Sequence, residues 1–111
     1  MRANSNRDNT DADSQLAQDL PAARRGVVSL VYGSGMEAGP CVRFLGPPPS
    51  SVNRQLRALG MRAVRLPVYH DYGMLVEGRF HLEWQVTEPR HFETARAWLR
   101  ANLAATPNDD T

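Results

Sequence analysis

The sequence predicts an α+β protein in which a mainly antiparallel sheet of four to five strands carries two helices on one face. Short runs rich in β-branched residues indicate the strands, and two segments with apolar side chains at helical spacing indicate the helices. The pair Glu77-Gly78 lies between two strand-like runs and is typical of a tight hairpin. The expected order of elements is β-β-α-β-β-β-α.

The two ends of the chain are poor in apolar residues. After Met1, residues 1–25 contain only Leu16 and Leu20 as sizeable apolar side chains, too few to offset the entropy of ordering the segment. The last residues have the same polar character. We therefore expect a disordered N-terminal tail over 1–25, a single α+β domain over 26–104 and a disordered C-terminal tail over 105–111.

A glycine cluster separates the first two predicted strands. Residues 27–32, VVSLVY, carry apolar side chains on both faces, so this strand is expected to be covered on both sides. Three glycines lie within residues 33–39, as in many nucleotide-binding loops, but Pro40 follows at once and the chain has no lysine for a Walker motif. The cluster is therefore predicted to be a hairpin loop. The second strand, 41–45, ends at the prolines 47–49.

The first predicted helix covers residues 51–59. Ser50 or Ser51 is a suitable N-cap, and Gly60 occupies the position where a glycine commonly ends a helix. The apolar residues recur at helical spacing and form one stripe for the core: Val52, Leu56 and Leu59.

Alternation of apolar and polar residues predicts the remaining strands. Between residues 61 and 68, the side chains expected to face the core are those of Val64, Leu66 and Val68, while Ala63 and Arg65 face away. The runs 74–76 and 79–86 are expected to pair around Glu77-Gly78. In the second run, the expected core side chains are Phe80, Leu82, Trp84 and Val86.

The second predicted helix follows Thr87 or Glu88, with Pro89 in its first turn. Glu93 and Arg96 are spaced to form an ion pair on its exposed side. Its buried stripe is expected to consist of Phe92, Ala95, Leu99 and Leu103, with Trp98 at the margin.

Composition indicates the compartment and the kind of genome. The chain has no apolar segment typical of a secretory signal or a membrane span, and Cys41 is its only cysteine, so we expect a cytoplasmic protein with no membrane partner. All 13 basic residues are arginine, and isoleucine is absent as well. This bias is typical of a high-GC genome, which we expect to be bacterial or that of an associated phage or plasmid.

No motif for catalysis, metal binding or cofactor binding rises above the background. His70, His81 and His91 lack the close paired spacing of metal ligands. Cys41 with His70 and Asp71 supplies the residue types of a thiol nucleophile, its base and an orienting acid, but any chain with one cysteine and several histidines does so. We therefore expect a non-enzymatic protein without a cofactor, in which Cys41 is an apolar packing residue.

The distribution of charge is the strongest functional signal. No acidic residue lies between Ala38 and His70, and this interval contains five arginines, whereas acidic residues dominate from 71 to 93. We expect these arginines to form a surface that docks a macromolecule, either a protein partner or the phosphates of a nucleic acid. The alternative is a homodimer that pairs through its sheet edge or near Trp98. The predicted binding residues are Arg43, Arg54, Arg57, Arg62 and Arg65.

Overall fold

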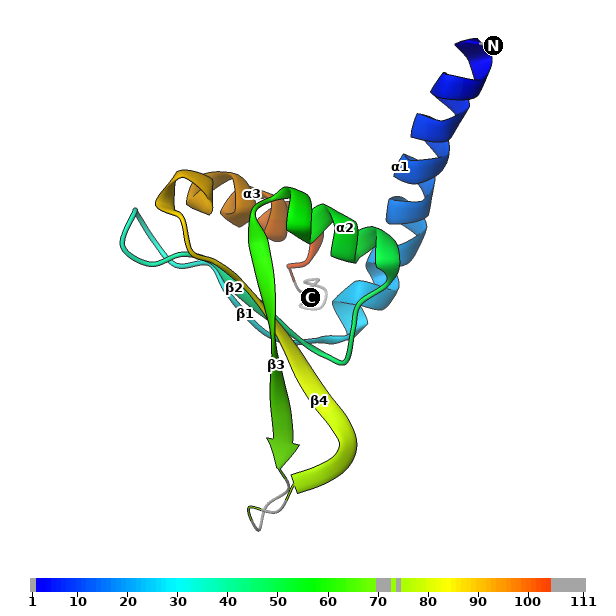
Figure 1. The fold of residues 1–111 in the computed structure, drawn as a ribbon. Helices are drawn as coiled ribbons and strands as arrows, with labels where there is room; N and C mark the ends of the chain where they lie inside the picture. Colours follow the sequence, from blue (N-terminus) through cyan, green and yellow to red (C-terminus); the bar gives the residue numbers. More distant parts are fainter. Residues whose placement is uncertain (1, 70–72, 74, 105–111) are drawn as a thin grey trace, which may run out of the picture.

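A computed structural model describes residues 2–69, 73 and 75–104 of the chain. It confirms the predicted α+β class, with a four-stranded antiparallel sheet in the order β1-β2-β4-β3. Helices α2 and α3 cover one face of this sheet, and α1 extends away from its side (Figure 1). The elements in chain order are α1 (Arg2–Arg25), β1 (Val27–Val31), β2 (Cys41–Leu45), α2 (Ser50–Ala58), β3 (Met61–Tyr69), β4 (Leu75–Val86), the 3₁₀ turn η1 (Pro89–His91) and α3 (Phe92–Asn102).

Strands β3 and β4 form one long hairpin, and the predicted hairpin at Glu77-Gly78 is wrong. Strand β4 runs unbroken from Leu75 to Val86, and its first residue already pairs with Tyr69 of β3. The chain therefore reverses between Tyr69 and Leu75, so the runs 74–76 and 79–86 do not pair with each other. The sequence contains a suitable turn pair, but pairing with β3 keeps that segment extended.

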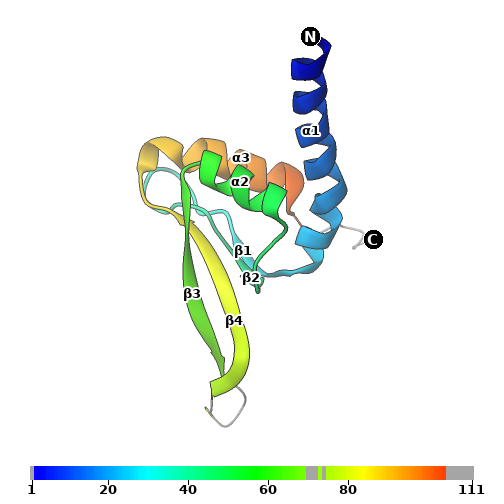
Figure 2. The same cartoon turned by 45° about the vertical axis from the view of Figure 1, so that its right-hand side comes forward.

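The outer part of this hairpin forms a two-stranded arm, residues 67–69 and 75–80. Strand β2 pairs with β4 only from His81 to Gln85, so beyond that point β4 has β3 as its single partner. Figure 2 shows the arm extending beyond the helices. Within the described part of the chain, no helix is long and apolar enough to span a bilayer.

The faces of β3 are the reverse of those predicted. Met61 is 2% exposed in the core. Because strand side chains alternate, Ala63 and Arg65 lie on the same side of the sheet as Met61. Val64 lies on the face that α2 and α3 do not cover, called the open face here, and is 44% exposed. Ala63 pairs with Trp84, and the Arg65 guanidinium lies 4.0 Å from the centre of the Phe80 ring. The burial of Met61 determines which side chains of β3 face the core. The pattern of Val64, Leu66 and Val68 alone predicted the opposite face.

The core lies between the sheet and the two covering helices. The predicted stripes of both helices are buried, and Leu56, Leu99 and Leu103 are among the largest side chains that solvent does not reach. Phe44 and Trp84 supply the aromatic bulk from the sheet. Gly60 has φ of +85°, which confirms its role as the residue after the end of α2.

Part of the segment predicted to be the N-terminal tail packs against the domain. Residues 2–25 form α1, and Leu20 and Ala23 belong to the core, at 9% and 1% exposure. The Ser51 hydroxyl donates a hydrogen bond to Asp19 at 2.7 Å. Ser51 is therefore not the N-cap of α2; that position is occupied by Pro49, which makes no side-chain cap bond. Few apolar residues suffice here because the helix needs to cover only one end of an existing core. The predicted C-terminal tail, 105–111, lies outside the described residues.

Strand β1 is an edge strand and is not covered on both sides as predicted. Val28 and Val31 are 50% and 52% exposed, and β1 has only β2 as a neighbour in the sheet. The connection to β2 is a hairpin loop, as predicted, with positive φ at Gly33 and Gly35. A Cβ at Gly39 would approach the Phe92 ring to 2.6 Å, so this glycine permits close packing of the loop on α3.

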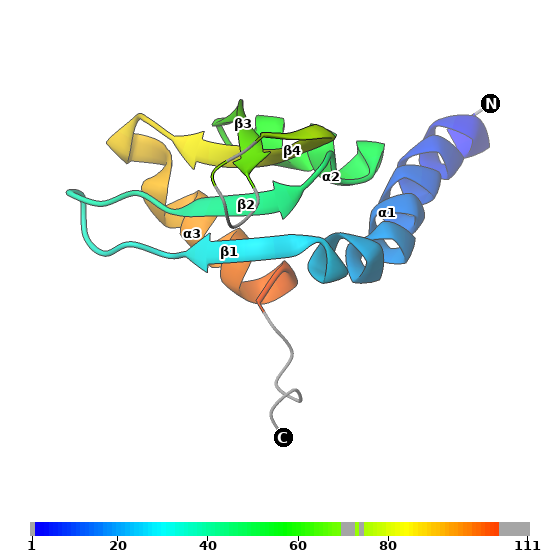
Figure 3. The same ribbon diagram turned by 90° about the horizontal axis from the view of Figure 1, so that it is seen from below.

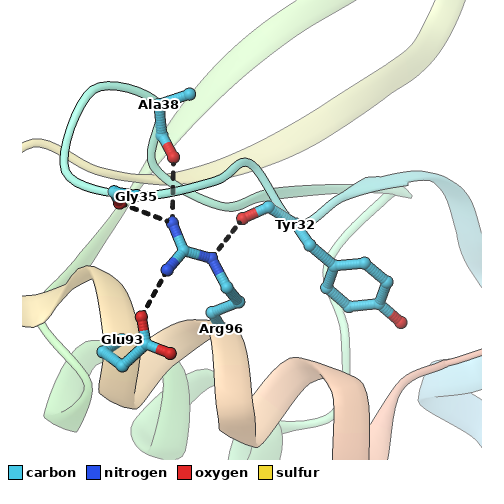
Figure 4. A network of polar contacts seen from close by, with 5 residues as sticks. All are labelled: Tyr32, Gly35, Ala38, Glu93 and Arg96. Atoms are coloured by element: carbon cyan, nitrogen blue, oxygen red, sulfur yellow. Dashed lines mark hydrogen bonds and ion pairs between the residues drawn. The ribbon is translucent and has the colours of Figure 1, made fainter.

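Arg96 holds that loop against α3. Its guanidinium donates to the carbonyl oxygens of Tyr32, Gly35 and Ala38 at 2.9–3.0 Å, as Figure 4 shows. The predicted ion pair with Glu93 forms, but Arg96 is only 5% exposed, so it is a buried structural residue rather than part of a solvated face. The loop carbonyls, which have no strand partner, are thereby satisfied.

Candidate functional site

The structure brings two of the five predicted arginines into one site. Arg54 and Arg57 are exposed on α2, and Arg62 and Arg65 are exposed on β3. Arg57 and Arg62 both line a cleft of about 620 Å³ between the end of α2, the start of β3 and η1. We call this site the basic cleft. Its lining residues are Arg57, Gly60, Met61, Arg62, Ala63, Thr87, Glu88, Arg90 and His91.

Arg43 does not belong to this surface. It lies on the open face of the sheet, where Nε and Nη2 donate to Oε1 of Glu83 at 2.8 and 2.6 Å. The two residues face each other across β2 and β4, and the Glu83 side chain is 13% exposed. A cation already satisfied by a neighbouring carboxylate has little left to offer a ligand, so the structure separates Arg43 from the predicted site.

The basic cleft has an excess of positive charge. Glu88 is the only carboxylate in its lining, and it pairs with Arg90 at 2.8 Å and lies 3.7 Å from Nε2 of His91. Among the described side chains, no carboxylate lies within ion-pair distance of Arg57 or Arg62. Two guanidinium groups are thus left to bind an anion from solution.

Packing beneath the cleft positions Arg57 and His91. The Arg57 guanidinium lies 5.6 Å from the centre of the Trp84 ring, and a cation over an indole face is electrostatically favoured. A Cβ at Gly60 would lie 2.8 Å from the His91 ring, so only glycine allows η1 to pack this closely on the end of α2. The end of α2 and the 3₁₀ turn are therefore held together at the cleft by local geometry.

Sequence reasoning missed Arg90 and His91. They lie about two dozen residues after Arg65 in an interval where acidic residues dominate, and the charge pattern along the chain gave no reason to group them with α2. Only the antiparallel pairing of Met61 with Val86 places η1 beside the start of β3. The one signal in the sequence was position: Arg62 lies at the start of one predicted strand, and Arg90 and His91 follow the end of a later one, so pairing of these two strands would bring them together.

The open face of the sheet carries a second polar cluster around Glu83. Its Oε2 accepts a hydrogen bond from Gln85 at 2.7 Å, and this bond, together with those from Arg43, lowers the pKa of Glu83. Burial, and then the nearby charge of Glu83, raises the pKa of the Cys41 thiol to about 11. A thiol with such a pKa is protonated at neutral pH, which makes Cys41 a poor nucleophile.

The other grouping considered from sequence lies partly outside the described residues. His70 and Asp71, the proposed partners of Cys41, lie outside them. His81 lies on the open face opposite Leu45 and Leu66, whereas His91 lines the basic cleft. Within the described part of the chain, no three His, Cys, Asp or Glu side chains are grouped to hold a metal ion.

Comparison with known proteins assigns no family to the chain. No family model matches it, and searches of curated proteins and of solved structures found no significant match.

Proposed function

We propose that this protein is a cytoplasmic, non-enzymatic binding protein that docks an acidic segment of a partner protein in the basic cleft. The observation that carries the proposal is that Arg57 and Arg62, which have no carboxylate partner among the described side chains, line one cleft, with Arg90 of a third element beside them. Arginine suits this role because its planar guanidinium can bind a carboxylate through two parallel hydrogen bonds.

The cleft is partly organised for binding before a partner arrives. The cation–π contact with Trp84 favours one position of the Arg57 side chain, so less rotamer freedom is lost there when a ligand binds. Arg62 supplies a cation that is not committed to a carboxylate among the described side chains. This arrangement favours a compact anion that reaches all three arginines.

A protein carboxylate fits the cleft better than a nucleic-acid backbone does. The lining includes Glu88, which interrupts the positive surface, and its one aromatic ring is that of His91, whose side chain is 38% exposed. Trp84 is 1% exposed beneath Arg57 and does not offer its face to a ligand. A short acidic segment needs neither a continuous positive track nor a stacking platform.

Nucleic-acid binding is the second candidate, because the basic surface continues beyond the cleft. Arg54 is exposed one turn before Arg57 on α2, and Arg65 lies on the helix side of β3 above Phe80. A nucleic-acid strand that contacts Arg54, Arg57, Arg62 and Arg65 would follow this surface towards the arm. Binding of that kind weakens steeply with salt, because it releases counterions from several phosphates.

Titration with two kinds of probe tests the proposal. The ¹⁵N-labelled protein is titrated with a polyglutamate peptide, a duplex DNA oligonucleotide and a single-stranded DNA oligonucleotide, each at two salt concentrations. We expect the peptide to shift amide signals of the cleft. In a Trp98→Phe background, the same peptide should change the fluorescence of Trp84, which lies under Arg57.

Matched charge reversals locate the binding surface. Arg57→Glu should weaken peptide binding by about tenfold or more, equivalent to at least about 1.4 kcal/mol. Arg79→Glu makes the same change in net charge on an exposed residue of β4 outside the cleft and should leave peptide binding intact. Equal losses in both variants, or DNA binding that exceeds peptide binding, would count against the acidic-segment proposal. The DNA result would favour the second candidate.

A further inference from the structure

The two edges of the sheet differ in their protection against pairing. Strand β3 carries Arg62, Arg65 and Pro67, and charges and proline on an edge strand discourage the addition of another strand. Strand β1, with the sequence VVSLV, contains neither a charge nor a proline, and its one irregularity is a shift in its pairing with β2 between Val27 and Ser29. Among the described residues, its outer edge pairs with no other strand, and Figure 3 shows it at the border of the sheet with α3 behind it.

Most of the side chains beside the free edge of β1 are apolar, with Ser29 and Arg24 among them as polar members. A groove of about 380 Å³ follows this strand, and Leu103 of α3 and Tyr32 form part of its wall. Val28 and Val31 are each about half exposed, at 50% and 52%. A strand that adds here would therefore gain apolar contacts as well as backbone hydrogen bonds.

Charge is distributed unequally between the two ends of this edge. Arg24 and Arg25 are exposed at the start of β1, where Nε of Arg24 donates to the carbonyl of Asn102 at 2.8 Å. Glu37 is exposed in the loop at the other end. The Glu93 side chain also lies there and is 82% exposed, but its carboxylate is paired with Arg96. Because α3 runs antiparallel to β1, its start is beside that loop and its end is beside Arg24.

We propose that the free edge of β1 pairs with the same edge of a second copy of this chain, giving a homodimer with a continuous eight-stranded sheet (two sheets of four). A twofold axis makes the two β1 strands antiparallel, so the basic end of each edge meets the acidic end of the other. Parallel pairing would bring arginines against arginines. The charges at the two ends of the β1 edge are complementary to those of the same edge in a second copy. A second copy therefore fits this edge better than an unrelated segment does. This inference is independent of the basic cleft and its partner.

Sedimentation velocity over a range of protein concentrations tests the proposal on the full chain. We expect the wild-type protein to be a dimer that dissociates on dilution. Val31→Lys places a charge on the β1 edge and should abolish the dimer. Val64→Lys is the matched control, since Val64 is a similarly exposed valine on the other edge strand, at 44%, and this variant should remain dimeric.

The possible outcomes separate edge pairing from other arrangements. A wild-type protein that stays monomeric at every concentration overturns the proposal, as does a Val31→Lys variant that still forms dimers. Loss of the dimer in both lysine variants would place the interface on the open face of the sheet and would equally overturn pairing at β1. Far-UV circular dichroism checks that each variant is folded.

A cysteine cross-link tests the antiparallel arrangement and does not depend on the lysine variants. Ser29 is the middle residue of β1, so antiparallel pairing brings it close to Ser29 of the partner subunit. Opposed residues in such a pair have Cα atoms about 4.5–5.5 Å apart, a separation that a disulfide can bridge. In a Cys41→Ser background, Ser29→Cys should form a cross-linked dimer, whereas Val64→Cys should not. A dimer that fails to cross-link at Ser29 contradicts pairing at β1.

Discussion

Glu83 forms a hydrogen-bonded cluster with neighbouring side chains on the open face of the sheet. The sequence predicted only that its side chain faces solvent. Its carboxylate accepts hydrogen bonds from Arg43, which lies opposite on β2, and from Gln85, which lies two residues further along β4 on the same face. These bonds require the ionised form. Because most of the Glu83 side chain is shielded, they contribute more than a pair on the surface would.

The pH dependence of stability should report this cluster. The hydrogen bonds from Gln85 and Arg43 lower the pKa of Glu83 below its ordinary value of 4.5. A depressed carboxyl pKa stabilises the folded state fully above the unfolded pKa, and this stabilisation is lost as pH falls through the folded pKa. The free energy of unfolding should therefore decrease below about pH 4.5, and Glu83→Gln should reduce that dependence and cost about 1–2 kcal/mol at neutral pH.

Urea denaturation at a series of pH values measures both effects. Glu88→Gln is the control, because the side chain of Glu88 is 57% exposed and its pair with Arg90 is on the surface. That variant should change the free energy of unfolding by less than about 1 kcal/mol. If Glu83→Gln shows the same acid dependence as the wild type, the stabilising role of the carboxylate is refuted.

At the scale of elements, the contact between the end of α2 and η1 depends on one glycine. Gly60 ends the helix with a positive φ and also leaves room for the His91 ring. These two requirements are separable, because Gly35 has a similar φ of +60° with nothing within 4 Å of the position of a Cβ. The two glycines therefore form a natural comparison.

Alanine substitution at these two glycines separates backbone strain from the steric clash. Gly35→Ala should cost about 1–2 kcal/mol, which is the left-handed strain alone. Gly60→Ala should cost more, because its Cβ meets His91, and should also perturb the amide signals of the basic cleft. Adding His91→Ala to Gly60→Ala should recover part of the loss. Chemical denaturation of all four proteins measures this, and equal costs at Gly35 and Gly60 would show that the contact with His91 is unimportant.

At the scale of the whole molecule, α1 extends the domain beyond the segment that the sequence marked as ordered. Leu20 and Ala23 cover the core beside α2, and Asp19 binds the hydroxyl of Ser51. The segment has weak apolar character, so its helical structure depends on this docking more than on its own propensity. Its last turns also place Arg24 and Arg25 beside β1.

Truncation of Leu20 tests whether α1 is docked. Leu20→Ala should lower the free energy of unfolding by about 2–3 kcal/mol, because a side chain that is 9% exposed loses its contacts with the core. Gln18→Ala changes an exposed residue of the same helix and should have almost no effect. Equal stability of the Leu20→Ala variant and the wild type would mean that this segment does not contribute to the folded domain.

The proposed binding surface combines contributions that no single segment supplies. Arg57 and Arg62 come from the arginine-rich interval, whereas Arg90 and His91 come from a turn that follows β4. The sequence grouped the first pair because the acid-free interval is a local feature. It placed Arg43 with them for the same reason, although the structure pairs this residue with Glu83 on the other face.

The sequence by itself determined the α+β class, the two covering helices with their buried stripes, and the glycine loop between β1 and β2. Those features depend on periodicity, capping and turn chemistry, which act over a few residues. Only the tertiary structure decided which face of β3 is buried, whether residues 75–78 turn or stay extended, how α1 docks, and which arginines share a cleft. Each of these depends on pairing between distant segments, where the burial of Met61 or the register of β3 on β4 outweighs the local pattern.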